Sequence, residues 1–294
     1  MDNVLKGRIV KGIGGFYYVD TDSGVKVCRA RGRFRKTGEM LYVGDIVSIG
    51  LQSDDSGYVL EIEERTNFMI RPPVANIDMI VIVASKAPPV TDIHFIDKIM
   101  VLAEHKNIEV SIVINKSDEN FGDEIYNIYK NTSAKVFRVS AKNGDGVEEL
   151  KCFIKGKFSA FTGNSGVGKS TLINALLPSA ELETGEINTK IGRGKHTTRQ
   201  VEVLKLDENT WIADTPGFSV FDVASDNEIT TENLRYLFPE FLDYEGECRF
   251  FGCSHIKDSG CALIQAVEEG KVERSRYESY KKIFSELDAL PKYK

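Results

Sequence analysis

Residues 163–170 read GNSGVGKS, and this segment constrains the fold more than any other part of the chain. A Gly-rich loop of this pattern binds phosphate where it follows a β-strand and opens an α-helix. Here the apolar segment 157–163 precedes the loop, and the amphipathic segment 169–177 follows it. The sequence therefore predicts a P-loop domain, and the full pattern in this context argues against a chance Gly-rich turn.

The chemistry of this loop assigns a role to each part of it. Glycines allow backbone N–H groups to curl around phosphates, and the start of the helix adds partial positive charge. Lys169 is expected to act in catalysis by reaching the β and γ oxygens, and Ser170 to offer its hydroxyl to Mg2+. The predicted phosphate site comprises Gly163, Asn164, Ser165, Gly166, Val167, Gly168, Lys169, Ser170 and Thr171.

A second candidate phosphate motif, Asp214-Thr215-Pro216-Gly217, ends the predicted strand 210–216. Open α/β sheets bind ligands at the carboxyl ends of their strands, so Asp214 is expected to hold Mg2+ through water. Alone, this tetrapeptide would indicate only a turn. Its place after a strand and downstream of a P-loop makes Asp214 and Gly217 candidate nucleotide-binding residues.

Two further loops predict guanine as the base. Asn115-Lys116-Ser117-Asp118 follows the predicted strand 109–115 and is similar to the NKxD motif of GTPases. A carboxylate such as Asp118 can accept hydrogen bonds from both N1–H and the amino group of guanine, and adenine offers no matching pair. Ser140-Ala141-Lys142 follows the predicted strand 134–140 and resembles the companion loop that supports the base. Either motif alone is weak, but together they predict GTP.

The remaining pattern predicts three domains, at 1–66, 67–222 and 223–294. Short alternating β segments in the first domain suggest an OB-type β-barrel that binds RNA. They lie at 7–12, 16–20, 25–32, 45–51 and 57–65. After Arg71-Pro72-Pro73, which is expected to break structure, buried strands alternate with amphipathic segments. This alternation predicts a mostly parallel sheet covered by helices, that is, an α/β P-loop GTPase domain.

The predicted elements of the central domain have definite places in the chain. Strands are expected at 77–85, 109–115, 134–140, 157–163, 201–206 and 210–216. Helices are expected near 91–107, 121–131, 146–155 and 169–177. Beyond Asp222 the strand pattern stops, and a last helix carries Tyr277, Tyr280, Ile283, Phe284 and Leu287 at helical spacing. These side chains are expected to pack on the C-terminal domain rather than to stack on bases.

The formal net charge of −6 would argue against a nucleic-acid partner, but the charge is unevenly distributed. Between Val25 and Gly38 there are six Lys or Arg residues and no acid, and four more lie between Lys190 and Arg199. In an extended strand, alternation would place four side chains on one face suited to RNA phosphates. They are Arg29, Arg31, Arg33 and Arg35. A solvated cationic face is the alternative.

A cysteine-rich segment near the C-terminus predicts a metal site. Cys248, Cys253, His255 and Cys261 form a C-x4-C-x-H-x5-C pattern, the ligand set of a closed structural zinc site. Such a site stabilises a small helical domain that lacks a large core, and buried or free thiols are the alternative. Cys28 and Cys152 are expected to be ordinary buried cysteines. An odd number of cysteines, no apolar run of about 20 residues and no signal-like start favour a cytoplasmic location without membrane contact.

The order of the motifs points to a family. In ordinary GTPases the phosphate loop comes first, whereas here NKSD and SAK precede GNSGVGKS. This circularly permuted order, with the β-rich start and the Cys/His tail, resembles the ribosome small-subunit-dependent GTPase family known as RsgA, or YjeQ/YloQ. The resemblance covers nearly the whole chain through Cys261. It implies GTP hydrolysis to GDP and phosphate, stimulated by the small (30S) subunit during late maturation.

The same resemblance implies partners and further site residues. It implies 16S rRNA as a partner, one structural Zn2+, and Mg2+ with GTP, while a monomer is the default. Segment 192–199 matches the family's switch region, so His196 corresponds to the proposed catalytic histidine and Thr198, rather than Thr197, is favoured as a Mg2+ ligand. Without the resemblance, His196 would be a solvated loop histidine.

One position departs from the usual GTPase pattern. Phe218 stands where a polar residue usually positions the attacking water, so slow intrinsic turnover is expected. The alternatives to a GTPase are a binding module that holds GTP only as a ligand, and a P-loop kinase or ATPase. The second alternative leaves NKSD and SAK unexplained. Because the segment after DTPG leads into the C-terminal domain, the bound nucleotide is also expected to influence that domain.

Overall fold

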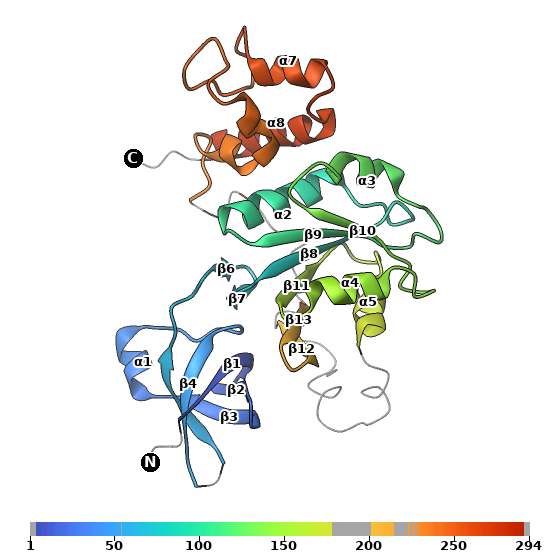
Figure 1. The fold of residues 1–294 in the computed structure, drawn as a ribbon. Coiled ribbons are helices and arrows are strands. Elements are labelled where there is room, and N and C mark those ends of the chain that lie inside the picture. The colour runs from blue at the N-terminus through green and yellow to red at the C-terminus, as the bar shows by residue number, and fades with distance from the viewer. Residues whose placement is uncertain are drawn as a thin grey trace. The chain divides into compact units, whose positions relative to one another are not determined.

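The computed structural model describes residues 4–53, 55–177, 201–214, 223, 226 and 228–290, with only the backbone of Arg35 and Glu202 (Figure 1). The chain divides into two compact units. The first comprises Met1–Met79, Lys151–Thr162 and Leu176–Phe218, and the second comprises Ile80–Leu150, Gly163–Ala175 and Ser219–Lys294.

The first unit contains a closed five-stranded barrel with the strand order β1-β2-β3-β5-β4. Its strands are β1 (Val4–Ile13), β2 (Phe16–Thr21), β3 (Gly24–Ala30), β4 (Ile46–Leu51) and β5 (Gly57–Ile62). Alternate side chains point inward and form a buried core that includes Ile9, Val19, Cys28, Val47 and Val59. The predicted OB-like barrel is therefore confirmed, and so is the burial of Cys28.

The prediction of one extended strand carrying four arginines is wrong. β3 ends at Ala30 and α1 (Gly32–Thr37) begins two residues later, so Arg29 lies on a strand, Arg31 precedes the helix, and Arg33 and Arg35 belong to it. Phe34 explains the change, because the helix buries its ring in the barrel core. Residues two apart on an α-helix point about 200° apart, so the positions 33 and 35 do not share a face. Their role in RNA binding stays a prediction.

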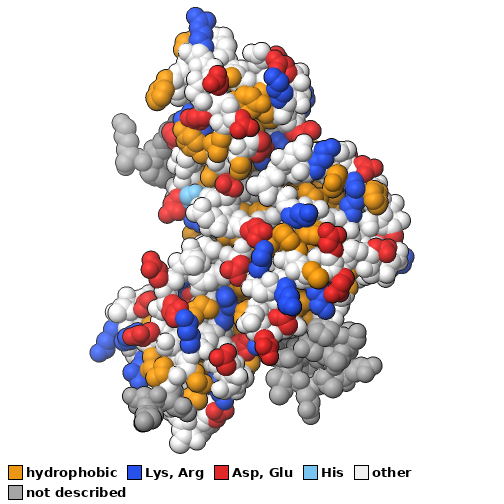
Figure 2. Space-filling model, viewed as in Figure 1, with side chains coloured by type: hydrophobic (Ala, Val, Ile, Leu, Met, Phe, Trp, Pro, Cys, Tyr) orange, Lys and Arg blue, Asp and Glu red, His pale blue; other side chains and the backbone are white. Residues whose placement is uncertain are grey.

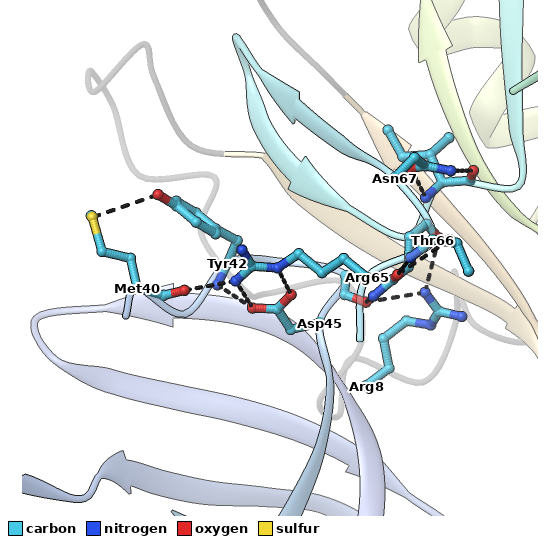
Figure 3. A network of polar contacts seen from close by, with 10 residues as sticks. Arg8, Met40, Tyr42, Asp45, Arg65, Thr66 and Asn67 are labelled. Carbon is cyan, nitrogen blue, oxygen red and sulfur yellow. Dashed lines mark hydrogen bonds and ion pairs between the residues drawn. The ribbon is translucent and has the colours of Figure 1, made fainter. Parts of the chain in front are cut away.

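An ion pair ties the end of the barrel to the loop before β4 (Figure 3). The guanidinium of Arg65 donates to both carboxylate oxygens of Asp45, at 2.7 and 2.9 Å, and to the carbonyl of Met40 at 2.7 Å. The Asp45 side chain is fully buried and also accepts the backbone N–H of Tyr42. Because its charge is paired and hydrogen-bonded, this buried carboxylate stabilises the loop.

The strands of the predicted α/β domain fall in both units. In the second unit β8 (Met79–Ala84), β9 (Glu109–Ile114) and β10 (Lys135–Arg138) are neighbours in the order β10-β9-β8. In the first unit the order is β11 (Phe158–Thr162), β13 (Thr210–Asp214) and β12 (Glu202–Asp207). β9 pairs with β10 and β11 with β13 in parallel, whereas β12 pairs with β13 antiparallel. The expectation of a mostly parallel arrangement is thus confirmed, with an antiparallel strand at one edge.

Helices follow the strands as the sequence predicted. They are α2 (Ile93–His105), α3 (Asp123–Tyr129), α4 (Val147–Ile154) and α5 (Lys169–Leu176). α2 is capped at its start by Asp92, whose carboxylate accepts the N–H of His94. Cys152 on α4 is exposed, so the prediction that it is buried is wrong. None of the described helices is long and apolar enough to cross a membrane.

The segment Arg71-Pro72-Pro73 does not simply interrupt structure. It connects two short antiparallel strands, β6 (Phe68–Ile70) and β7 (Pro73–Ala75), with Ile70 paired to Pro73. Proline is compatible with this position because a two-stranded ribbon has edges on both sides, where a missing N–H leaves no ladder bond unmade. The predicted break is therefore a tight turn.

The C-terminal part of the second unit is helical. It contains η3 (Leu234–Leu237), η4 (Pro239–Tyr244), α7 (Ala262–Glu268) and α8 (Arg274–Asp288). Its core joins aromatic and aliphatic side chains from these elements with Val101 of α2. Tyr277, Tyr280, Ile283 and Leu287 of α8 are buried in this core and Phe284 packs against it, which confirms the packing expected for the last helix.

Candidate guanine-nucleotide and metal sites

One buried amide joins three predicted nucleotide-binding segments. Asn115, at the end of β9, is 2% exposed. Its Nδ2 donates to the carbonyls of Val167 and Gly168, at 2.9 and 3.4 Å, and its Oδ1 accepts the N–H of Ala141 at 3.1 Å. The base-reading motif, its companion loop and the P-loop therefore lie side by side in the second unit, held by a single side chain.

The close approach of Asn115 requires glycine at position 168. Gly168 has φ of 90°, a conformation that L side chains rarely adopt, and a Cβ there would overlap Nδ2 of Asn115. The α5 helix begins directly afterwards, with Leu172 N donating to Gly168 O at 2.9 Å. The glycine thus permits both the turn of the loop and its contact with the base-reading motif.

The P-loop combines a buried anchor with accessible groups. Val167 is fully buried, whereas Ser165, Gly166, Ser170 and Thr171 are exposed. Gly163, Asn164 and Gly168 are partly buried. Lys169 is the first residue of α5 and is also partly buried. An apolar anchor under an exposed polar loop suits a phosphate cradle, because the backbone N–H groups must keep their positions as the anion binds.

A hydrogen bond from Ser140 orients the carboxylate of Asp118, which can accept hydrogen bonds from a ligand. Its Oδ1 accepts the hydroxyl of Ser140 at 2.7 Å, and this hydrogen bond lowers the pKa of Asp118. Ser140 is fully buried and its Oγ also accepts the N–H of Asn143. Asp118 itself is exposed, so its carboxylate is accessible to a ligand. An ionised, oriented carboxylate fits the proposed contact with guanine.

A proline pair next to these loops was not predicted from the sequence. Lys116 Nζ donates to Pro88 O at 2.7 Å, and Pro89 lies beside Gly166 of the P-loop, where a Cβ would come within 3.1 Å of its ring. The segment is fixed by Ser85, whose hydroxyl donates to Ala87 O and whose backbone N–H donates to the hydroxyl of Thr91. The available signal was its place directly after buried β8, where α/β sheets bind ligands.

The predicted Mg2+ and catalytic residues are only partly described. Asp214 is the last residue of β13 and stands in register with Phe161 of the parallel strand β11, so it lies at the carboxyl end of its strand as expected. Gly217, His196, Thr198 and Phe218 lie outside the described residues. Their roles stay predictions.

The Cys/His segment folds into a compact group of four potential ligands. The ligand atoms of Cys248, Cys253, His255 and Cys261 all lie within 4.8 Å of one another. Cys248 Sγ is 3.8 Å from Cys261 Sγ, and His255 Nδ1 is 3.6 Å from Cys248 Sγ and 3.3 Å from Cys261 Sγ. A zinc tetrahedron with Zn–S bonds of about 2.3 Å has sulfur–sulfur edges of about 3.8 Å. The four residues therefore form a group that fits zinc.

The surroundings of this group favour a cation. Burial raises the pKa of the Cys253 and Cys261 thiols, so thiolates here require a positive partner. Burial also lowers the pKa of His255, which keeps the imidazole neutral and able to bind metal. Backbone N–H groups of Ala262 and Ile264 point at Cys248 and Cys261 sulfurs, at 3.3 and 3.5 Å. These donors stabilise negative charge on sulfur.

Buried tyrosines hold the backbone of the metal loop. Tyr277 donates its hydroxyl to His255 O at 2.8 Å, and Tyr280 donates to Ser254 O at 2.7 Å. Arg235 Nη1 donates to Cys253 O at 3.1 Å. The periodic aromatic residues of α8 therefore have a structural task, because they fix the loop that carries two of the four ligands.

Comparisons with known proteins agree with this architecture. The RsgA GTPase family model matches residues 62–224, and the RsgA N-terminal domain model matches residues 6–59. A relative from Caldanaerobacter subterraneus subsp. tengcongensis, named small ribosomal subunit biogenesis GTPase RsgA, is 44% identical over 96% of each chain. One from Oceanobacillus iheyensis, named small ribosomal subunit biogenesis GTPase RsgA 2, is 43% identical over 99% of this chain and all of the relative.

Solved structures show the same fold. The crystal structure of YjeQ from Thermotoga maritima matches with a TM-score of 0.83 and 35% identity, covering 98% of this chain and 99% of that one. The crystal structure of YloQ, described as a circularly permuted GTPase, matches with a TM-score of 0.80 and 35% identity, covering 99% and 98%. The resemblance inferred from the order of the motifs is therefore confirmed. The chain belongs to the RsgA GTPase family and is a GTP-hydrolysing enzyme.

Proposed function

We propose that this chain hydrolyses GTP to GDP and phosphate during late maturation of the small ribosomal subunit, and that the 30S subunit stimulates the reaction. The names of relatives that are 44% and 43% identical over nearly the whole chain support the ribosomal role. The observation that carries the nucleotide site is the side chain of Asn115, which connects the P-loop to both base-reading loops.

In this proposal the nucleotide is recognised at both ends. The carboxylate of Asp118 accepts N1–H and the amino group of guanine, while Ser117, Lys116 and the loop Ser140-Ala141-Lys142 support the base. Backbone N–H groups of residues 163–170 and the Lys169 ammonium neutralise the phosphates. Ser170 and Thr198 would hold Mg2+, and Asp214 and Gly217 would serve the γ-phosphate end of the site. Mg2+ would supply charge neutralisation on the phosphate oxygens.

Hydrolysis in this proposal depends on the switch segment. Phosphoryl transfer needs an oriented water molecule and charge neutralisation more than a strong base. Since Phe218 cannot orient water by hydrogen bonding, His196 is the proposed catalytic residue of the chain. Slow turnover by the isolated protein follows from Phe218, and the family resemblance supports faster turnover on the subunit.

We further propose one structural Zn2+ in the group Cys248, Cys253, His255 and Cys261. The ligand set and the spacing of the ligand atoms support zinc. With four protein ligands the ion has no open position, so its task is to stabilise the C-terminal domain. The proposed domains are 1–66, 67–222 and 223–294, in a monomer that acts in the cytoplasm with 16S rRNA as its contact.

The first test is GTP turnover by the purified protein with and without small ribosomal subunits. ATP serves as the wrong nucleotide, and Lys169→Ala serves as the inactive control. Strong stimulation by subunits, no use of ATP and an inactive control support the proposal. If GTP binds and turnover stays flat with subunits present, the ribosomal stimulation and the role of His196 are wrong, and the binding-module alternative suggested by Phe218 replaces them.

A further inference from the structure

An aromatic–cationic row crosses three neighbouring strands of the barrel. Phe16 on β2 is paired in register with Arg29 on β3, and Arg29 is paired with Tyr58 on β5. Phe16 and Tyr58 are 37% and 38% exposed, and Arg29 is exposed as well. Residues in register on adjacent strands lie about 5 Å apart, so these three side chains form a continuous strip.

The alternation of the strands shows that this strip faces away from the barrel core. The neighbours of the three residues along the strands, Tyr17, Cys28 and Val59, belong to the core. A β-strand directs successive side chains to opposite faces, so the row of Phe16, Arg29 and Tyr58 lies on the outer face. Aromatic side chains that gather on the outer face do not contribute to the buried core. Their presence there is therefore not explained by core packing, and such exposed patches often mark binding sites.

Next to this row lies a second one with the same character. Lys11 on β1 is paired with Tyr18 on β2, and Tyr18 is paired with Val27 on β3. The Lys11 ammonium is 5.5 Å from the Tyr18 ring centroid, and the Arg29 guanidinium is 4.5 Å from that of Phe16. The second row thus adds one cation and one ring to the outer face and ends at the aliphatic Val27.

The positive charge on this face is available to a ligand. Among the residues that the structure describes, Arg29 and Lys11 have no carboxylate within ion-pair distance, and their recorded contacts are with aromatic rings. By contrast, Lys26 on β3 is paired with Asp55 at 2.7 Å. Elsewhere acidic and basic side chains are mixed, as on the face of the molecule drawn in Figure 2. Lys11 and Arg29, as the cations of this face without such a partner, are therefore the groups that would attract an anionic ligand to it.

We propose that this outer face, defined by Phe16, Arg29 and Tyr58 and extended by Lys11 and Tyr18, binds an unpaired RNA strand by stacking its bases. The inference rests on the proposed ribosomal function and names the kind of RNA that the barrel contacts. It replaces the incorrect strip of four arginines, of which Arg29 is the member that β3 carries.

The chemistry of the face favours single-stranded over double-stranded RNA. Every base has a flat π face, and aromatic side chains in OB folds bind successive unpaired bases by stacking. In a duplex these faces are covered by neighbouring bases, so only phosphates would remain for Arg29 and Lys11. Strand faces of OB barrels are also the surfaces on which oligonucleotides bind. The row offers two rings and a guanidinium plane, which match short runs of bases.

The test is binding of fluorescent oligouridine about 10 nucleotides long, the size that an OB fold covers, measured by fluorescence anisotropy on the full-length zinc-loaded protein. Phe16→Ala, Tyr58→Ala and Arg29→Ala are each expected to weaken binding about 5- to 100-fold. A fully paired RNA duplex of equal charge is expected to bind weakly and to be affected mainly by Arg29→Ala.

The matched control is Phe121→Ala. Phe121 is 57% exposed and lies under the guanidinium of Arg138 at 4.2 Å, but Arg138 is neutralised by Asp123 at 2.6 Å. This aromatic–arginine pair resembles the row in composition and lacks its free charge, so its variant is expected to bind oligouridine like the wild type. Phe16→Leu retains apolar volume on the strand and lacks a flat ring, so it is expected to lose affinity without disturbing the barrel.

Pelleting with small ribosomal subunits separates the two proposals. If the wild-type protein does not pellet with subunits, the proposed function fails. If the wild type pellets but does not bind oligouridine, or if Phe16→Leu and Tyr58→Ala bind it as tightly as the wild type, the stacking face is wrong and the proposed function stands. Unchanged GDP affinity in each variant shows that the GTPase domain is intact.

Discussion

Arg276 of α8 and Asp97 of α2 form a buried ion pair, with 2.6 Å between Nη1 and Oδ1 and side chains that are 1% and 0% exposed. Glu240 accepts Arg276 Nε at 2.7 Å, and the hydroxyl of Tyr129 donates to Asp97 Oδ1 at 2.6 Å. Burial alone would lower the pKa of Arg276, but the charges of Asp97 and Glu240 outweigh burial and raise it. The pair thus joins α2 to the C-terminal helices within the second unit.

Breaking this pair is expected to destabilise the protein strongly. Arg276→Met removes the guanidinium and leaves Asp97 as an unpaired buried charge, which typically costs about 3–5 kcal/mol of unfolding free energy. Urea unfolding followed by circular dichroism measures the loss. The control on the same helix is Lys281→Ala, which breaks a surface ion pair with Glu278 and is expected to change stability by less than about 0.5 kcal/mol. If both variants unfolded at the same urea concentration, the buried ion pair would not stabilise the protein more than the surface pair does.

Asn115→Ala is expected to weaken nucleotide binding more than it affects the fold. The variant leaves the N–H of Ala141 and the carbonyl of Val167 without their partner. Unsatisfied groups of this kind cost about 1–3 kcal/mol, which here is the free energy that keeps the loops in their binding arrangement. The affinity for GDP should therefore fall roughly 5- to 150-fold, as measured by calorimetric titration. The exposed Asn127 on α3 offers a control, and Asn127→Ala should bind GDP like the wild type. Normal affinity in Asn115→Ala would show that the loops do not depend on this bridge.

Asp118→Asn tests which base the site reads. An amide can accept N1–H and donate to a carbonyl, so it matches xanthine, which carries a carbonyl where guanine carries its amino group. The variant should bind GDP at least about 100-fold more weakly and bind xanthosine diphosphate more tightly than the wild type does. Competition against a fluorescent nucleotide measures both affinities. Retention of the preference for GDP would mean that Asp118 does not face the base.

Sequence reasoning located the strands and the loops that follow them because both signals are local. The alternation of β1 and the continuous apolar run of β9 depend on neighbouring residues, and the P-loop pattern specifies its own flanking elements. The family resemblance then depended on the order of the motifs along the chain, which folding does not change.

The errors and omissions arose from contacts between distant parts of the chain. Alternating arginines fit a strand as well as a short helix, and burial of Phe34 among Ile9 and Val47 decides for the helix. In the sequence, Arg276 looks like an ordinary solvent-exposed cation of a terminal helix. Its burial depends on the ion pair with Asp97, which lies 179 residues away in sequence. The contact of Pro89 with the P-loop likewise depends on tertiary structure.

Removal of the proposed zinc ion is expected to unfold the C-terminal domain selectively. Cys253 and Cys261 lie in the buried core of this domain, so removal of the cation leaves a group of buried ligands there without its shared partner. Chelation, or Cys261→Ser, should lower the helical signal and increase proteolysis after residue 228, while GDP binding persists. Elemental analysis should find one zinc per chain in the wild type and little in Cys261→Ser. The exposed Cys152 gives the control, and Cys152→Ser should retain the metal.

The stability of the barrel should decline at alkaline pH because of Cys28. Burial raises the pKa of this thiol from 9.0 to about 11. Since the folded-state pKa lies above the unfolded value, the contribution of the thiol to stability is complete below pH 9.0 and is lost as the pH rises towards about 11. Cys28→Ala lacks this titration, so the difference in unfolding free energy between the wild type and the variant should shrink over that range. Urea unfolding at several pH values measures it, with Cys152→Ala as the exposed control. A difference that does not vary with pH would show that the thiol does not ionise on unfolding.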